Sequence, residues 1–101
     1  MPLEQARAVA AAARQRRASL VGDLASGDLA PSRLEEDERV GEVKVVVIAE
    51  AVPGVGKVRA RHLLQDLGIP ATTHWADVPT AQRRALIDAL TADGARPATA
   101  P

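Results

Sequence analysis

The stretch that decides the fold of this chain is Val52-Pro53-Gly54-Val55-Gly56-Lys57-Val58-Arg59-Ala60-Arg61. Two glycines lie one residue apart between an apolar run and a segment with the pattern of an amphipathic helix. Glycine adopts backbone conformations that other residues avoid, and it lets the main chain approach a ligand closely. The first amides of the following helix point outward, with the positive end of the helix dipole behind them. The stretch therefore predicts a turn that binds phosphate.

The charges beside this turn favour the same interpretation. Lys57, Arg59 and Arg61 lie at the start of the predicted helix, where positive charge opposes the helix dipole. Acidic residues would stabilise the helix better at these positions. The alternative is a plain tight turn in a helical bundle with a solvated charged face. The unfavourable placement of three cations indicates an anionic partner instead.

A nucleotide-binding P-loop is excluded by residue identity. That motif has the pattern G-x-x-x-x-G-K-[ST]. Ala51 stands at the position of its first glycine, and Val58 replaces the hydroxyl residue that would hold magnesium. The chain also leaves no room for a nucleotide-binding sheet after residue 60. We therefore expect no nucleotide hydrolysis.

The composition is that of one small helical domain. The chain has 101 residues and one aromatic residue, Trp75, so its core must consist of Leu, Val, Ile and Ala. The absence of cysteine excludes disulfides and thiolate metal sites. The uncharged run at residues 8–13 is too short for a secretory or membrane segment, and we expect a cytoplasmic protein. The net charge is zero, yet two basic regions, residues 1–25 and 43–68, flank an acidic region at residues 26–42.

The first half of the chain predicts two helices and one ambiguous segment. A long helix is expected over about residues 3–25, ending at Ser26-Gly27. The sequence Ser32-Arg33-Leu34-Glu35 matches the S-x-x-E capping box of a short second helix. Residues 43–52 fit a strand by propensity and a helix by spacing, and the local pattern leaves both open.

The second half predicts two further helices. One follows the glycine turn and ends at Gly68-Ile69, with an apolar stripe of Ala60, Leu63, Leu64 and Leu67. The other covers about residues 80–91 and is expected to have Thr80 as its N-cap. Its aliphatic side chains should face inward and its arginines outward (Leu86, Ile87 and Leu90; Arg83 and Arg84). Residues 1–91 thus form one domain, and residues 92–101 are expected to be a disordered tail.

The remaining polar and aromatic residues predict no catalytic or metal site. Trp75 is expected to fill the edge of the core, and the alternative is a wedge between DNA bases. The acidic segment at residues 35–42 and His62 are expected to be solvated. His74, beside Trp75, is a lesser candidate for a DNA contact. Because no nucleophile lies in a recognisable arrangement with a base, we expect neither an enzyme nor a cofactor, metal or small-molecule substrate.

A family resemblance extends these inferences. Residues 43–69 resemble actinobacterial integration host factors through the pattern Val45-x-x-Ile48-Ala49-Glu50-x-Val52-Pro53-Gly54-Val55-Gly56-Lys57-Val58-Arg59-Ala60-Arg61-x-Leu63-Leu64-x-x-Leu67-Gly68-Ile69. Those proteins are small, nucleoid-associated binders of duplex DNA with a helix-two-turns-helix motif. The resemblance implies an all-α fold in which a long N-terminal helix packs on a small bundle containing the motif. It also favours a helix for the ambiguous segment.

The resemblance implies which residues contact DNA. By position, the backbone phosphates are contacted by the hairpin residues Gly54, Val55, Gly56, Lys57, Val58, Arg59 and Arg61. Arginines of the first helix are candidates for additional contacts: Arg7, Arg14 and Arg17. After Ile69 the family has a basic loop, whereas this chain has residues 71–77 with His74 as the single cationic candidate. This departure and the acidic segment lower the expected electrostatic attraction.

The expected function is therefore a non-enzymatic, nucleoid-associated architectural protein that binds duplex DNA with little dependence on sequence. Two alternatives remain open. One is RNA binding through a similar hairpin. The other is a protein-interaction module, in which the acidic segment and the arginine-bearing first helix contact a protein partner and the hairpin is vestigial.

Overall fold

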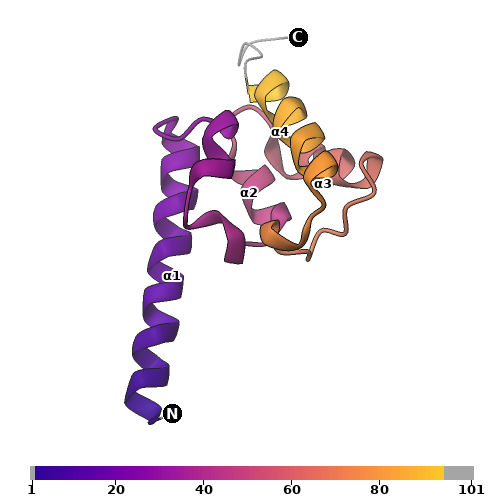
Figure 1. The fold of residues 1–101 in the computed structure, drawn as a ribbon. Helices are drawn as coiled ribbons and strands as arrows, with labels where there is room; N and C mark the ends of the chain where they lie inside the picture. The colour runs from indigo at the N-terminus through magenta and orange to yellow at the C-terminus, as the bar shows by residue number, and fades with distance from the viewer. Residues whose placement is uncertain (1, 95–101) are drawn as a thin grey trace.

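The computed structural model describes residues 2–94, and within these residues the chain is helical, without a strand (Figure 1). The all-α prediction is confirmed. Four α-helices follow one another along the chain: α1 (Leu3–Ser26), α2 (Val45–Ala51), α3 (Gly56–Asp66) and α4 (Thr80–Gly94). Short 3₁₀ helices connect them: η1 (Pro31–Glu36), η2 (Val40–Glu42) and η3 (Trp75–Asp77).

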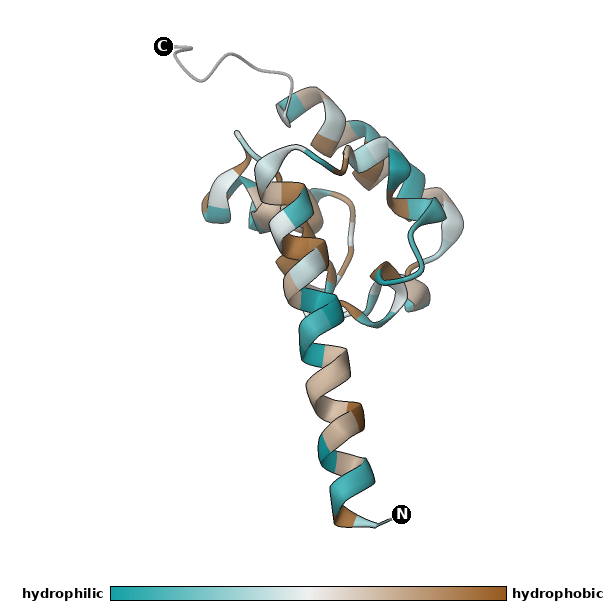
Figure 2. Ribbon diagram, turned by 90° about the vertical axis from the view of Figure 1, so that its left-hand side faces the viewer, coloured by the Kyte–Doolittle hydropathy of each residue, from teal (hydrophilic) through white to brown (hydrophobic). Residues whose placement is uncertain are grey.

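Helix α1 packs on the body of the molecule through its second half only. Its buried residues are Leu20 and Leu24, whereas Leu3 is 66% and Val9 57% exposed. The first half of α1 projects away from the other helices in both views (Figures 1 and 2). If an apolar stripe ran along the whole of α1, the first half of the helix would also pack on the other helices. The contact therefore comes from the leucines, and the alanines of the first half contribute helix propensity rather than core.

A cluster of hydrogen bonds fastens α1 to the connecting segment. Arg39 donates from Nε and Nη2 to the two carboxylate oxygens of Asp37, at 2.9 and 2.7 Å. Its Nη1 donates to Asp23 and to Ser19 on α1, both at 2.8 Å. Bonds from a guanidinium to a carboxylate are among the strongest in proteins because both partners are charged. The pKa of Asp37 is lowered, chiefly by the hydrogen bond from Arg39.

The predicted capping box does not form. The segment begins as a 3₁₀ helix at Pro31 after Ala30, and no side chain caps it. Proline fixes the backbone at this first helical position, where its missing N–H would have had no partner within the helix. Glu35 instead forms an ion pair with Arg83 of α4, with Oε1 2.9 Å from Nε, although the angle falls short of a hydrogen bond. The side chain of Arg83 is only 20% exposed, so its predicted outward position was wrong.

The ambiguous segment is a helix with an extended residue before it. In α2, Val45, Ile48 and Ala49 are completely buried, which confirms the helical spacing. The amide of Val45, at the start of α2, donates to the Thr73 carbonyl at 2.9 Å. The strand propensity of the segment is expressed in one isolated antiparallel bridge between Lys44 and His74.

Two helices complete the core. Helix α3 buries Ala60, Leu63 and Leu64, and it ends as predicted. Gly68 has a φ of +70°, its N–H donates to the Gln65 carbonyl, and the N–H of the buried Ile69 donates to the Leu64 carbonyl. This is the Schellman arrangement that glycine favours.

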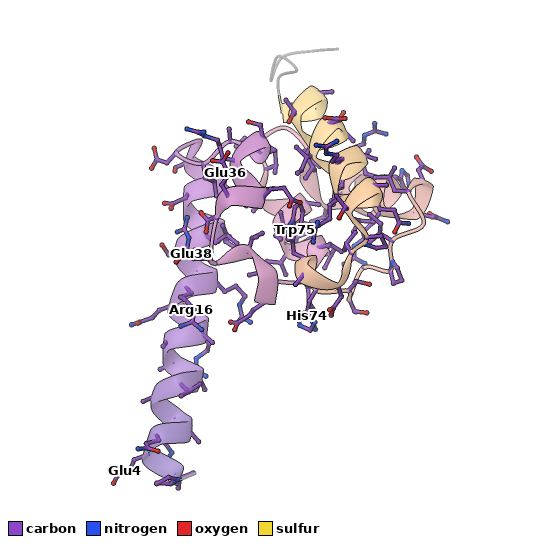
Figure 3. All side chains as sticks on the ribbon, viewed as in Figure 1. Glu4, Arg16, Glu36, Glu38, His74 and Trp75 are labelled. Atoms are coloured by element: carbon purple, nitrogen blue, oxygen red, sulfur yellow. The ribbon has the colours of Figure 1, made fainter. Side chains whose placement is uncertain are left out.

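Helix α4 begins at Thr80 rather than after it, and it covers the core with Leu86 and Leu90. It continues to Gly94, so the expected disorder was wrong for residues 92–94. The rest of the predicted tail, residues 95–101, lies outside the described residues. Trp75 is 2% exposed and lies inside the helical body, which confirms its place in the core (Figure 3).

The Arg39 cluster predicts how stability depends on pH. An acid whose pKa is lowered by folding contributes stability above its unfolded pKa, here 3.8, and that contribution is lost as the pH falls through the folded pKa. Asp37→Asn should therefore lower the free energy of unfolding by about 1 kcal/mol at pH 7, and the difference from the wild type should shrink below about pH 4. Urea unfolding at several pH values measures this. Glu38→Gln removes a neighbouring exposed charge and should change little; equal effects of the two substitutions would contradict the assignment.

Candidate nucleic-acid interface

The glycine hairpin between α2 and α3 turns around one buried side chain. Val55 is 6% exposed and faces the core, and its N–H donates to the Val52 carbonyl at 3.2 Å. Gly54 and Gly56 on either side of it have φ values of +86° and +75°. Side-chain-bearing residues rarely adopt this conformation. The two glycines thus let the chain direct one side chain inward while the neighbouring main chain stays at the surface.

The start of α3 presents main-chain amides to solvent. The residues Gly56, Lys57 and Val58 are all exposed, and the side chain of Val58 is 71% exposed. The first amides of a helix have no partner within the helix. Val55 precedes α3 and provides no side-chain cap. This end of α3 therefore combines donor groups with the positive end of the helix dipole, which suits an anionic group.

The three predicted cations of α3 differ in their surroundings. Lys57 is exposed. Arg61 is 70% exposed, with its Nε 3.6 Å from a Glu50 carboxylate oxygen. Arg59 is 43% exposed, and its Nε donates to Asp93 of α4 at 2.6 Å. The hydrogen bond that Arg59 donates to this carboxylate is the main cause of the raised pKa of Arg59, so its charge is permanent.

Asp93 was not predicted from the sequence. It lies in a run of Ala and Thr residues that was assigned to the tail, 34 residues from Arg59. No local sequence pattern could predict this contact, because it depends on α4 continuing as far as the hairpin in the folded chain.

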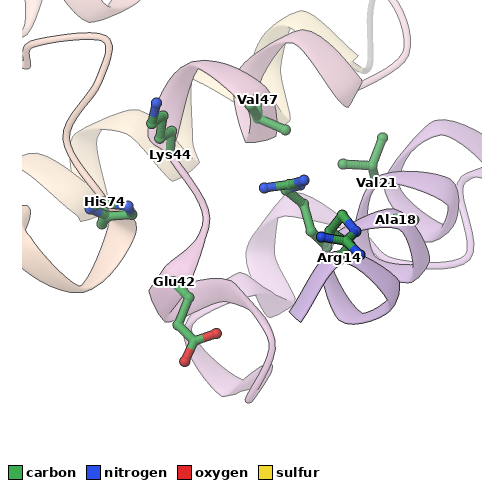
Figure 4. A pocket seen from close by; sticks show the side chains of 8 residues that line it. Arg14, Ala18, Val21, Glu42, Lys44, Val47 and His74 are labelled. Carbon is green, nitrogen blue, oxygen red and sulfur yellow. The ribbon is translucent and has the colours of Figure 1, made fainter. Parts of the chain in front are cut away.

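A second basic surface lies between α1 and the start of α2. A cavity of about 520 Å³ is lined by Arg14, Arg17, Ala18, Val21, Glu42, Lys44, Val47 and His74. In Figure 4, Arg14 lies on the α1 side and faces Lys44 and His74 across the opening. The structure thus brings two of the candidate arginines of the first helix, Arg14 and Arg17, together with Lys44 and His74. The sequence did not predict that these residues share one surface. Arg7 is exposed further along the projecting half of α1 and does not line this cavity.

The two basic surfaces lie at opposite ends of α2. Lys44 directly precedes this seven-residue helix, and the hairpin follows it after Val52. Several carboxylates of the acidic segment form ion pairs with arginines of the same chain. The pairs are Glu35–Arg83, Glu36–Arg33, Asp37–Arg39 and Glu42–Arg16.

Other site types find little support in the part of the chain that the structure describes. No group of three or more His, Cys, Asp or Glu side chains among residues 2–94 could hold a metal ion. No helix within that range is both long and apolar enough to cross a membrane. His62 is exposed on α3.

Comparison with known proteins identifies the family. The S13-like H2TH domain family matches residues 31–90. Integration host factor of Mycobacterium tuberculosis is 37% identical over 83 residues, covering 78% of this chain and 79% of the relative. The chain belongs to the actinobacterial integration host factor family. The integration host factor of Streptomyces coelicolor is 38% identical over 64 residues, which cover 59% of this chain and 60% of the relative.

A solved integration host factor has the same fold. The structure of sIHF bound to an 8-base-pair palindromic DNA has a TM-score of 0.69 and 30% identity, covering 80% of this chain and 96% of that one. The resemblance drawn from residues 43–69 is confirmed. The matched H2TH region contains the hairpin and most of α4, whereas α1 precedes it.

The backbone of the hairpin can be tested with two glycine substitutions. An added Cβ would meet nothing within 4 Å at either Gly56 or Gly22, and only Gly56 has a positive φ. Gly56→Ala should therefore lower the free energy of unfolding by about 1 kcal/mol. Gly22→Ala, within helix α1, should raise it by about 0.5–1 kcal/mol. Urea unfolding distinguishes the two. Equal stability of Gly56→Ala and the wild type would show that the hairpin tolerates an ordinary backbone conformation at residue 56.

Proposed function

We propose that this integration host factor is a non-enzymatic architectural protein that binds duplex DNA through its phosphate backbone, with little dependence on sequence. The observation that carries the proposal is the exposed start of α3, where main-chain amides and Lys57 share one surface beside Arg59 and Arg61. The DNA in the solved sIHF complex supports duplex DNA as the partner. The nucleoid is the corresponding location.

The residues assigned to this contact are Gly54, Val55, Gly56, Lys57, Val58, Arg59 and Arg61. Their roles differ. The glycines and the buried Val55 set the conformation of the turn, and the amides after it bind a phosphate. Lys57 and Arg61 add charge. Contacts with phosphate position a protein on a duplex without reporting base identity, and this accounts for the proposed tolerance of sequence.

The second basic surface gives the proposal its architectural part. Arg14 and Arg17 line the cavity with Lys44 and His74, at the end of α2 opposite the hairpin. A protein that bends DNA needs contacts at more than one place along the duplex, because deformation is opposed by the stiffness of the helix. Arg7 would extend this surface along the projecting half of α1.

The protein-interaction alternative has less support. It requires an acidic segment that is available to a partner, yet Glu35, Asp37 and Glu42 already form ion pairs within the chain. RNA binding remains a competing hypothesis that a direct comparison of duplex DNA with structured RNA would decide.

The hairpin contact predicts a change in salt dependence. Lys57→Ala with Arg61→Ala should reduce the slope of log K against log salt by about 1.8, because about 0.9 is expected for each neutralised phosphate. Fluorescence anisotropy with labelled duplexes of unrelated sequence measures the slope, which should be similar across sequences. The matched control is Arg33→Ala with Arg84→Ala, which removes two exposed cations elsewhere. An equal loss of slope in both double variants would refute a site at the hairpin.

The second surface predicts a separate effect on DNA shape. Arg14→Ala with Arg17→Ala should abolish or reduce bending while the hairpin still binds DNA. Energy transfer between dyes at the two ends of a duplex reports bending, and anisotropy on the same samples reports binding. If the bend persists unchanged at saturating protein, the cavity between α1 and α2 has no part in it.

A further inference from the structure

The end of α4 contains a buried carboxylate next to the hairpin. Asp93 is the single charged residue among residues 2–94 that is buried, at 3% exposure. Its Oδ2 accepts a hydrogen bond from Arg59 Nε at 2.6 Å, and the Asp93 side chain is 4% exposed. Burying a charge is unfavourable unless it is paired, so this contact holds Asp93 and Arg59 together strongly.

The main chain beside Asp93 supports the hairpin as well. A Cβ at Gly54 would lie 3.2 Å from the Asp93 carbonyl oxygen. A Cβ at Gly94 would lie 3.2 Å from the Val52 side chain and 3.5 Å from the Pro53 carbonyl oxygen. The last residues of α4 and the two sides of the hairpin are thus in close contact, and glycine is the residue that fits at both positions.

The geometry of the ion pair leaves part of Arg59 available. The bond to Asp93 is made by Nε, and 43% of the arginine side chain is exposed. A guanidinium has five N–H donors in a rigid plane, so one edge can bind a carboxylate while the remaining donors face another anion. A long side chain that is held in this way loses less conformational freedom when it binds phosphate.

We infer that Asp93 is a positioning residue for DNA binding: it orients Arg59 and supports the Gly54 turn, so that both meet the phosphate backbone. This inference rests on the proposed function. Asp93 is a buried acid beside the surface proposed to bind a polyanion. Simple electrostatics therefore predicts that its removal strengthens DNA binding, whereas positioning predicts that its removal weakens it.

The test exploits this difference in sign. Asp93→Asn should weaken binding to a duplex by about tenfold, the effect of losing one charge-assisted hydrogen bond, and should reduce the salt slope by about 0.9. Asp88→Asn is the matched control, because Asp88 is an exposed acid on the same helix. It should leave binding unchanged or make it slightly tighter. Anisotropy titrations at several salt concentrations, on samples shown to be folded by circular dichroism, provide both quantities.

A double-mutant cycle separates positioning from general damage. If Asp93 acts through Arg59, then Arg59→Ala and the Arg59→Ala, Asp93→Asn double variant should bind DNA equally. Arg59→Lys keeps the charge but loses the planar guanidinium, and it should also weaken binding. This last variant decides the question if Asp93→Asn does not fold.

Three results would overturn the inference in distinguishable ways. Binding by Asp93→Asn that equals or exceeds that of the wild type would show that the carboxylate only opposes the DNA. Full affinity of Arg59→Lys would show that orientation of the guanidinium is irrelevant. Absence of DNA binding by the wild type would instead overturn the proposed function, and the inference with it.

Discussion

The inward position of Val55 is the constraint on which the rest of the interface depends. Val55 lies at the tip of the hairpin, and its side chain reaches the core only if the backbone turns sharply on both sides of it. Gly54 and Gly56 make these turns possible because both adopt positive φ values. The anchored valine also fixes where α3 begins. The amides of the first turn therefore lie at the surface because of a packing contact below them.

The chain has a net charge of zero and still has two basic surfaces. This is possible because most of its carboxylates form ion pairs within the chain. Carboxylates of the acidic segment pair with Arg33 and Arg39 of the segment itself, with Arg16 of α1 and with Arg83 of α4. The pairs with Arg16 and Arg83 connect the segment to α1 and α4. The cations at the hairpin and in the cavity beside Lys44 are left at the surface. Attraction to a polyanion depends on this local distribution, and the total charge does not describe it.

The features that the sequence predicted well are those set by neighbouring residues. The Gly68-Ile69 stop and the apolar stripe of α3 follow from spacing and backbone preference. The errors concern contacts between distant elements. Glu35 pairs with Arg83 of α4 instead of completing a capping box, and Arg83 is 20% exposed instead of facing outward. The position of Asp93 likewise depends on the path of α4, which local patterns do not contain.

The ion pairs that Arg59 and Arg61 form with carboxylates also explain how the hairpin tolerates its positive charges. Cations at the start of a helix oppose the dipole, yet Asp93 and Glu50 place a carboxylate beside two of them. The free protein thereby offsets part of the repulsion without giving up the donors. If the hairpin binds DNA as proposed, a phosphate would take over this role for Arg61, whose ion pair is long and exposed. The buried Asp93 would not be displaced in this way, so the proposed contact would have a fixed Arg59 and an adjustable Arg61.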